Sequence, residues 1–189
     1  MAADTPQVAP GDLLVSSTEL VEPTFRRTVV YLVEHSGTGS LGVVLNRPSE
    51  ARVSDVVPAW GEQAAAPATI FVGGPVRRDA ALCLGVLRPA AALLAGMRPV
   101  EGRVVMVDLE SEPAELAAGL AGVRLFAGYS GWSAGQLEGE LRRDDWYVVP
   151  SLPGDLLTPP GVDLWAQVLR RQPMPLALLA THPLEPDRN

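Results

Sequence analysis

The 189-residue sequence contains one cysteine, two histidines and no lysine, and each scarcity excludes a class of protein. The single cysteine, Cys83, cannot form an internal disulfide bond. The two histidines lie far from each other and from Cys83, without the spacing of metal ligands, so we predict neither a metal site nor a bound cofactor. No apolar run approaches the roughly 18 residues that would indicate a membrane-spanning helix.

Secretory features and excess positive charge are also missing. The first residues lack the basic region and the apolar core of a signal peptide, which together with the scarcity of cysteine predicts a cytoplasmic protein. The formal net charge is −7 at pH 7. Direct nucleic-acid binding depends on cations that neutralise phosphates, so we expect none, and we expect no membrane binding. The oligomeric state stays open.

The sequence does contain enough apolar residues, 47%, for the core of one domain. We predict that residues 11–182 form this domain, between a disordered tail over 1–10 and a frayed tail over 183–189. Runs rich in β-branched and aromatic residues predict strands over 13–17, 28–35, 41–46, 69–72, 80–87, 103–109, 123–129 and 146–150. Helices are expected over 112–121, 133–143 and 160–171, with one helical turn within 54–60 and one further strand in the tail from residue 176. Early hairpins followed by an alternating second half predict an α+β fold with a largely antiparallel sheet.

The stretch EHSGTGSLGVVLNRP, residues 34–48, predicts a hairpin with polar residues at both ends. Glu34 and His35 are consecutive on a strand, so their side chains point to opposite faces and cannot share one proton or metal ion. A loop over 36–40 would place His35 opposite Leu41 and Glu34 opposite Gly42. We expect Glu34 to accept backbone N–H bonds from the loop, and His35 to cap the loop or contact a ligand.

The other end of the hairpin carries Asn46, Arg47 and Pro48. In the same register Asn46 lies opposite Val30 and on the face of Glu34, but about 13 Å from it, because a strand rises about 3.3 Å per residue. Pro48 ends the ladder and holds Arg47 extended. Two readings of Arg47 stay open: its guanidinium grips a carboxylate or phosphate as a ligand contact with Asn46, or it pairs with an acidic side chain of the chain itself.

Two further turns combine glycine with polar or aromatic residues. In VGGPVRRD, Gly73, Gly74 and Pro75 form either a tight turn between strands or the rim of an anion pocket into which Arg77 points. The motif has neither the spacing of a P-loop nor that of a dinucleotide fingerprint.

In GYSGWSAGQLEGEL, Ser133 and Gln136 have the spacing of a capping box at a helix start, where free N–H groups attract anions. Tyr129 and Trp132 either line a pocket there or pack in the core. Ser130 has the context of a hydrolase nucleophile, and Asp163 and His182 follow in a suitable order. Trp132, however, occupies the position where the nucleophile elbow requires a small residue. We therefore predict no catalytic residue.

Four motifs in this order and spacing resemble the YqgE/AlgH family of small bacterial proteins: FRRTVVYLVEH, GSLGVVLNRP, FVGGPV and GYSGWSAGQLEGEL with a following tryptophan. The resemblance runs from about residue 11 to 150 and continues in a closing helix, DLWAQVL. It implies an α+β domain whose split, largely antiparallel sheet curls into a pseudo-barrel flanked by helices. The positions that match the family's signature are Arg27, Glu34, His35, Asn46, Arg47, Pro48, Gly73, Gly74, Pro75, Gly128, Tyr129, Trp132, Gly135, Gln136 and Trp146.

The resemblance does not imply one settled activity. One branch of the family is described as a transcriptional regulator of alginate synthesis, and many members carry a cysteine where this chain has Val33, so no thiol-redox role carries over. Arginine, glycine and aromatic residues are scattered over several turns without an acid–base set, which favours a non-enzymatic regulatory protein that binds a small anionic ligand or a protein partner. The alternatives are a DNA-contacting transcriptional regulator, without a readable helix-turn-helix, and a hydrolase or nucleotide-processing enzyme.

Overall fold

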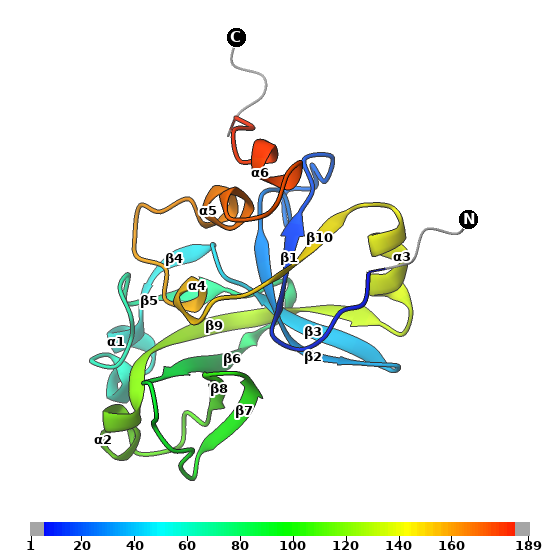
Figure 1. Ribbon diagram of the computed structural model, residues 1–189. Coiled ribbons are helices and arrows are strands. Elements are labelled where there is room, and N and C mark those ends of the chain that lie inside the picture. The colour runs from blue at the N-terminus through cyan, green and yellow to red at the C-terminus, as the bar shows by residue number, and fades with distance from the viewer. Residues whose placement is uncertain (1–5, 184–189) are drawn as a thin grey trace.

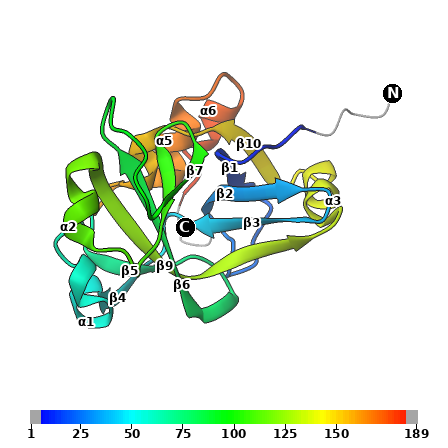
Figure 2. The ribbon, with the colours of Figure 1, turned by 90° about the horizontal axis from the view of Figure 1, so that it is seen from below.

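The longest strand, β9 (Leu120–Ser133), joins the two halves of one sheet in the computed structural model, which describes residues 6–183. β9 pairs with β6 from Leu120 to Ala127 and again at Tyr129, and its last residues, 130–133, pair with β3. Gly128 lies where the β6–β9 register shifts, and its φ of +71° is a conformation that favours glycine. The sheet therefore divides around β9, as Figures 1 and 2 show.

The other strands are β1 (Asp12–Ser16), β2 (Val29–Ser36), β3 (Gly39–Val44), β4 (Pro48–Arg52), β5 (Thr69–Val72), β6 (Val76–Leu87), β7 (Met97–Glu101), β8 (Val104–Val107) and β10 (Trp146–Pro150). Their order is β10-β1-β2-β3-β9-β6-β8-β7, and β5 attaches β4 to β9. Named strands over residues 6–183 pair antiparallel, except β5 with β9. The predicted α+β class and the curled antiparallel sheet are confirmed.

The helices are short and lie around the curled sheet: α1 (Val53–Val56), α2 (Pro113–Leu116), α3 (Gln136–Arg142), α4 (Pro153–Leu156), α5 (Leu164–Arg170) and α6 (Leu176–Leu179). In Figure 1, α5 and α6 lie together at one end of the molecule, and α3 lies at the far end of β3 and β9. Within residues 6–183, no helix is long and apolar enough to cross a membrane.

The buried side chains form three clusters, which hold the layers together. The largest contains the inward residues of β1, β2, β3, β6 and β9 together with α5, where Trp165 donates to the carbonyl of Ser16 at 2.9 Å. The second, around Trp60, fills the space among β6, β8, β9 and α2. The third packs α3 on β2 and β3, with Trp132 and Trp146 edge to face. Burial of these side chains supplies most of the free energy of folding.

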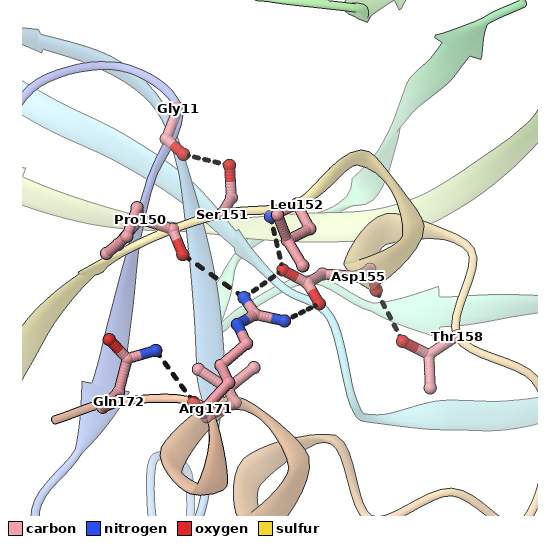
Figure 3. A network of polar contacts seen from close by, with 9 residues as sticks. Gly11, Pro150, Ser151, Leu152, Asp155, Thr158, Arg171 and Gln172 are labelled. Atoms are coloured by element: carbon pink, nitrogen blue, oxygen red, sulfur yellow. Dashed lines mark hydrogen bonds and ion pairs between the residues drawn. The ribbon is translucent and has the colours of Figure 1, made fainter.

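A buried ion pair fastens the C-terminal segment to the sheet (Figure 3). The Asp155 carboxylate, 2% exposed, accepts two hydrogen bonds of 2.6 Å from the Arg171 guanidinium and one of 2.7 Å from the Leu152 N–H. Arg171 also donates to the carbonyl of Pro150, at the end of β10. The pair thereby joins α4, α5 and the last strand.

Several predicted elements have other bounds. β4 and β7 were not predicted, and the strand expected from residue 176 is wrong, because residues 176–179 form α6. The helix predicted over 112–121 stops early, since the chain enters β9 at Leu120, which is buried. The other two helices start later than predicted. Gly135, with φ +74°, precedes α3, and the Asp163 carboxylate caps α5 by accepting from Ala166 N–H.

Part of the N-terminal tail predicted over 1–10 lies within the described residues. There, Val8 is 8% exposed and packs in the third cluster. Residues 1–5 and 184–189 lie outside the described residues, and with them most of the predicted tails.

The β2–β3 hairpin forms, but the predicted register is wrong. Its turn comprises residues 37–38 instead of 36–40, and the pairing shifts at a bulge between Leu32 and Glu34. A bulge inserts one unpaired residue and turns the strand locally. The pattern of apolar residues in the sequence does not reveal this bulge, because that pattern is the same whether or not the strand is bulged.

The tip of the hairpin therefore pairs one residue out from expectation. His35 lies opposite Ser40 rather than Leu41, and Glu34 lies opposite Leu41 rather than Gly42. A shift of one residue exchanges the faces of a strand, so the neighbours of every polar side chain at the tip change with it.

Candidate functional site

An open groove of about 710 Å³ lies where the β2–β3 hairpin separates from β6 and β7. Figure 2 shows β2, β3 and the end of β9 running toward α3 and away from β7. Hairpin residues 33–36 and 38–41 form one side, Pro99 and Val100 of β7 the other, and Tyr129, Gly131 and Trp132 of β9 lie between, with Pro10 and Val76 at the ends. The walls mix apolar and hydroxyl-bearing side chains.

His35 is the imidazole of this groove, and the hairpin holds it in place. Its Nδ1 lies 2.8 Å from the Ser40 hydroxyl directly across the hairpin, and its Nε2 lies 3.9 Å from the Glu138 carboxylate on α3. The first contact is the loop-capping arrangement that the sequence analysis offered for His35. The side chain stays 20% exposed, so it is open to a ligand.

Glu34 lines the same groove and contacts β7. Its carboxylate accepts a 3.0 Å hydrogen bond from Arg98 on β7, so the expected bonds from the loop backbone are replaced by an ion pair with a different strand. Both side chains are more than half exposed, and the pair contributes at most about 1 kcal/mol to folding. Glu34 and His35 thus have separate partners, as strand alternation requires.

A second hollow, of about 800 Å³, adjoins the groove around the hairpin tip. It is lined by Pro6, Gln7 and Val8 on one side, by hairpin residues 35–37 on the other, and by Glu138. His35 and Ser36 line both hollows, so the tip of the hairpin borders both spaces.

Tyr129 and Trp132, the two aromatic residues predicted for the site, differ in their surroundings. Tyr129 lines the groove and is partly buried against the main core. Trp132 is 6% exposed, and its Nε1 donates to Glu140 at 2.8 Å, as does Nε1 of Trp146. Trp132 therefore fixes α3 beneath the groove more than it offers surface to a ligand.

Gln136 belongs to the same network. Its Oε1 accepts the Ser133 N–H at 3.0 Å, half of the predicted capping box, and its Nε2 donates to Glu140 at 3.1 Å. Glu140 is a site residue that the motifs do not single out, although its position four residues after Gln136 places both on one helix face. Arg98 is another, because the sequence between residues 87 and 103 has no clear strand or helix pattern.

The Asn46–Arg47–Pro48 end of the hairpin forms a separate site. The Asn46 amide accepts from Val29 N–H at 3.0 Å and donates to the Arg27 carbonyl at 2.9 Å, and so continues the ladder past the end of β3. The Arg47 guanidinium donates to the carbonyls of Arg26 and Asn46. Within residues 6–183 it has no carboxylate partner, and burial lowers its pKa. Pro48 begins β4 and lines a cavity of only about 90 Å³.

The two glycines of the GGP turn allow backbone to approach backbone, not ligand. A Cβ on Gly73 would lie 2.4 Å from the Gly128 carbonyl oxygen, and one on Gly74 would lie 2.2 Å from the carbonyl of Tyr129. Ser130, fully buried, donates to the Gly73 carbonyl at 3.2 Å. The turn is thereby packed onto β9.

Pro75 and Arg77 lie on the exposed side of the same turn. Arg77 adopts φ +48° and pairs with Asp79 at 3.2 Å. The residues predicted to bind a ligand therefore occupy three places: Tyr129, Trp132 and Gln136 near the groove, Asn46 and Arg47 at the base of the hairpin, and Gly73, Gly74 and Arg77 at the β5–β6 turn. They do not form one anion pocket.

The chain is similar to known proteins over nearly its whole length. The sequence profile described as AlgH-like matches residues 13–177, which include the hairpin, the GGP turn, β9 and α3. The chain belongs to the AlgH-like family. A UPF0301 protein of Rhodococcus jostii is 62% identical over 190 residues, covering 100% of this chain and 94% of that protein. One of Mycobacterium tuberculosis is 60% identical over 185 residues, covering 97% and 92%.

Two solved structures share this AlgH-like fold. The crystal structure of a Corynebacterium diphtheriae protein has a TM-score of 0.90 and 37% identity, covering 95% of both chains. The solution structure of the AlgH protein from Pseudomonas aeruginosa has a TM-score of 0.68 and 29% identity, covering 98% of this chain and 100% of that one. The YqgE/AlgH resemblance found in the motifs is therefore confirmed, and so is the fold that it implied.

The hydrolase arrangement considered for this AlgH-like chain is not formed. Ser130 is buried, Asp163 pairs with Arg27, and His182 is joined to Arg27 through its carbonyl. Among the described residues no hydrogen bond connects Ser130, Asp163 and His182. No group of three histidine, cysteine or acidic side chains within residues 6–183 is placed to hold a metal ion.

Proposed function

We propose that this AlgH-like chain is a non-enzymatic regulatory protein of the cytoplasm that binds a protein partner around the tip of its β2–β3 hairpin. One observation carries the proposal: two hollows, of about 710 and 800 Å³, share His35 and Ser36 as lining residues. Together they offer a surface on both sides of one projecting element. The cytoplasm stays the predicted compartment because the only cysteine is buried and unpaired.

The shape of the hollows favours a protein segment over a small molecule. Small-molecule sites enclose most of their ligand in a largely apolar cavity of about 300–1,000 Å³. This groove is open along its length, and its walls alternate apolar residues such as Val33 and Tyr129 with polar ones such as Ser36 and Thr38. Protein interfaces have this mixture of apolar centre and polar rim.

Binding of a small anion at the base of the hairpin is a weaker alternative. Arg47 supports it, because its half-buried guanidinium has no carboxylate partner among the described residues. Its guanidinium, however, donates to two backbone carbonyls, which already satisfy part of its donors. Direct DNA contact is less favoured still, because the net charge is −7 and the described helices are at most seven residues long.

A second candidate function, hydrolysis, rests on one specific observation. Ser40, His35 and Glu138 follow one another at 2.8 and 3.9 Å, an order of groups that resembles a nucleophile, a base and an acid. We test it by treating the protein with a fluorophosphonate probe, with Ser40→Ala as the control. Labelling at Ser40 would establish an activated hydroxyl and overturn the non-enzymatic proposal, whereas an unlabelled Ser40 supports it.

Partner binding is tested by placing a photo-crosslinking amino acid at Thr38, which is exposed in the groove, in the full chain expressed in cells. The matched control carries it at Glu50, exposed on β4. We expect one covalent adduct from position 38 and none from position 50. The purified partner should then bind wild type and lose affinity for Thr38→Trp but not for Glu50→Trp. Equal crosslinking from both positions would refute the proposal.

A further inference from the structure

One edge of β2 has no neighbouring strand at the hairpin tip. β1 pairs with β2 as far as Tyr31, and the Gly11 N–H donates to the Leu32 carbonyl at 2.7 Å. β2 continues to Ser36, paired on its other side with β3. In the part of the chain that the structure describes, no strand pairs with the β1 side of residues 33–36.

The unpaired edge presents hydrogen-bonding groups. In an antiparallel ladder, backbone N–H and C=O groups point alternately toward the partner strand and away from it. Some of the N–H and C=O groups over residues 33–36 therefore face away from β3. Unpaired edges of this kind are templates for another strand.

The chain before β1 leaves room beside this edge. Pro6, Gln7 and Val8 form the far wall of the 800 Å³ hollow, and hairpin residues 35–37 form its near wall. Val8 is held in that position by burial in the third cluster. The N-terminal segment thus turns away from β2 instead of extending β1 along it, and the hollow separates the two.

The charges around the hollow select the occupant. The Glu138 carboxylate lines it, 3.9 Å from the His35 imidazole. Two arginines that adjoin groove-lining residues are already paired, Arg98 with Glu34 and Arg77 with Asp79. With a net charge of −7 on the whole chain, a cationic segment complements this surface and an anionic one does not.

We propose that an extended segment of the partner, carrying arginine or lysine, adds as a strand to the free edge of β2 at residues 33–36, with a cation facing Glu138. This inference rests on the proposed function and specifies its occupant. Strand addition derives affinity from main-chain hydrogen bonds and specificity from alternate side chains. It displaces no strand, because none of the described strands pairs with this edge.

The test uses a fluorescein-labelled heptapeptide of alternating valine and arginine, followed by fluorescence anisotropy with the full chain. We expect saturable binding that weakens with salt. N-methylation of the alternate amides that face β2 should weaken the affinity of the peptide at least about tenfold, because backbone hydrogen bonds are lost. N-methylation of the other set of amides, which face away from β2, should weaken it much less. A valine–glutamate heptapeptide should not bind measurably.

Matched variants locate the contact. Glu138→Gln should weaken the valine–arginine peptide about two- to fivefold, as expected for a partly exposed ion pair, and Glu50→Gln on β4 should leave it unchanged. Amide exchange of residues 33–36 should slow when peptide is bound. Binding that tolerates N-methylation in both phases, or equal effects of the two variants, would overturn strand addition.

The remaining outcomes separate this inference from the proposed function. If the heptapeptides fail to bind while position 38 still crosslinks to a partner, the inference is wrong and partner binding stands. If neither occurs, both are wrong. If sedimentation instead shows that a second copy of the chain pairs at this edge, with dimerisation blocked by Ser36→Pro, the occupant named here is wrong.

Discussion

At the scale of single residues, the interior contains an arginine that no carboxylate compensates within the described chain. Arg124 on β9 is 2% exposed, and burial lowers its pKa to about 10. Its Nη2 donates to the carbonyls of Ala66 at 3.1 Å and Thr158 at 3.3 Å, and its guanidinium stacks 4.2 Å above the Phe71 ring. The side chain therefore joins two loops that lie far apart in the sequence, through backbone oxygens and an aromatic face.

Tyr31 gives a pH-dependent prediction at the same scale. Its hydroxyl is buried without a hydrogen-bond partner among the described residues, and burial, followed by the charges of Glu101 and Asp12, raises its pKa above the ordinary value of 10. The unfolded chain therefore releases this proton first as pH rises. The contribution of this proton to the free energy of unfolding is therefore complete below about pH 10 and is lost as the pH rises above it.

Tyr31→Phe removes this linkage and the unpaired hydroxyl. We expect the variant to be as stable as wild type or about 1 kcal/mol more stable at pH 7, because an unsatisfied buried hydroxyl is unfavourable. Above about pH 10 its free energy of unfolding should fall less steeply than that of wild type. Urea unfolding at a series of pH values measures both effects, and parallel curves for the two proteins would contradict the assignment.

Cys83 gives a second prediction for a single residue. It is 2% exposed in the second core cluster, and burial raises the pKa of its thiol. The reactive thiolate is therefore both inaccessible and unfavourable. We expect the thiol to react with a disulfide reagent only as fast as the protein unfolds, with complete reaction in 6 M guanidinium chloride. Rapid reaction of the native protein would show that Cys83 is exposed.

At the scale of elements, contact between the GGP turn and β9 determines how the sheet divides. Gly73→Ala would place a methyl group 2.4 Å from the Gly128 carbonyl oxygen, so one of the two segments must move. We expect a loss of about 1–3 kcal/mol or more in the free energy of unfolding. The control is Gly154→Ala in α4, where no atom lies within 4 Å of the added Cβ. It should be neutral or slightly stabilising. Equal stability of the two variants, measured by urea unfolding, would refute the close approach.

The sequence pattern predicts the strands whose own residues favour a strand. It fails where pairing with a distant segment determines the local structure. The runs that become β2, β3, β5 and β10 are dominated by β-branched or apolar residues, and they were found close to their true bounds. β4, with the sequence PSEAR, has no such signal, because pairing with β5 creates it. The bulge at the tip of β2 has no local signal either, and it changed the predicted neighbours of Glu34 and His35.

The candidate site follows the same division. The hairpin, the aromatic residues and the two glycines were found as motifs, but their roles depend on contacts across the sheet. Gly73 was read as a tight turn or a ligand rim, and its neighbour is the backbone of β9. Glu138 entered the site only because α3 lies beside the hairpin tip, which no spacing within the sequence reveals.

At the scale of the whole molecule, three arginines hold the C-terminal segment in place. Arg27 pairs with Asp163 at the start of α5, and Arg124 of β9 binds the carbonyl of Thr158. Arg171, at the end of α5, pairs with Asp155 of α4 and donates to the carbonyl of Pro150 at the end of β10. Each planar guanidinium makes several hydrogen bonds at once, which a lysine ammonium cannot reproduce in the same geometry. The chain closes its half-barrel through these contacts as well as through apolar packing.

The Arg171–Asp155 pair provides the test of this closure, because Asp155 is 2% exposed and Figure 3 shows it enclosed by its partners. Arg171→Met leaves a buried carboxylate with only the Leu152 N–H, and we expect it to cost about 3–5 kcal/mol in the free energy of unfolding. Adding Asp155→Asn neutralises the orphaned charge while keeping an acceptor for that N–H. The double variant should therefore recover at least about 1 kcal/mol.

Arg52→Met is the matched control for Arg171→Met, because its ion pair with Asp55 is exposed at both ends. Its cost should stay below about 1 kcal/mol. Urea unfolding followed by circular dichroism measures all three variants under one set of conditions. A similar small cost for Arg171→Met and Arg52→Met would mean that the C-terminal segment is held by its apolar contacts, with the buried pair contributing little. A large cost relieved in the double variant would show that it comes from leaving the Asp155 carboxylate buried without Arg171, and the cost that remains in the double variant would measure what the pair itself contributes.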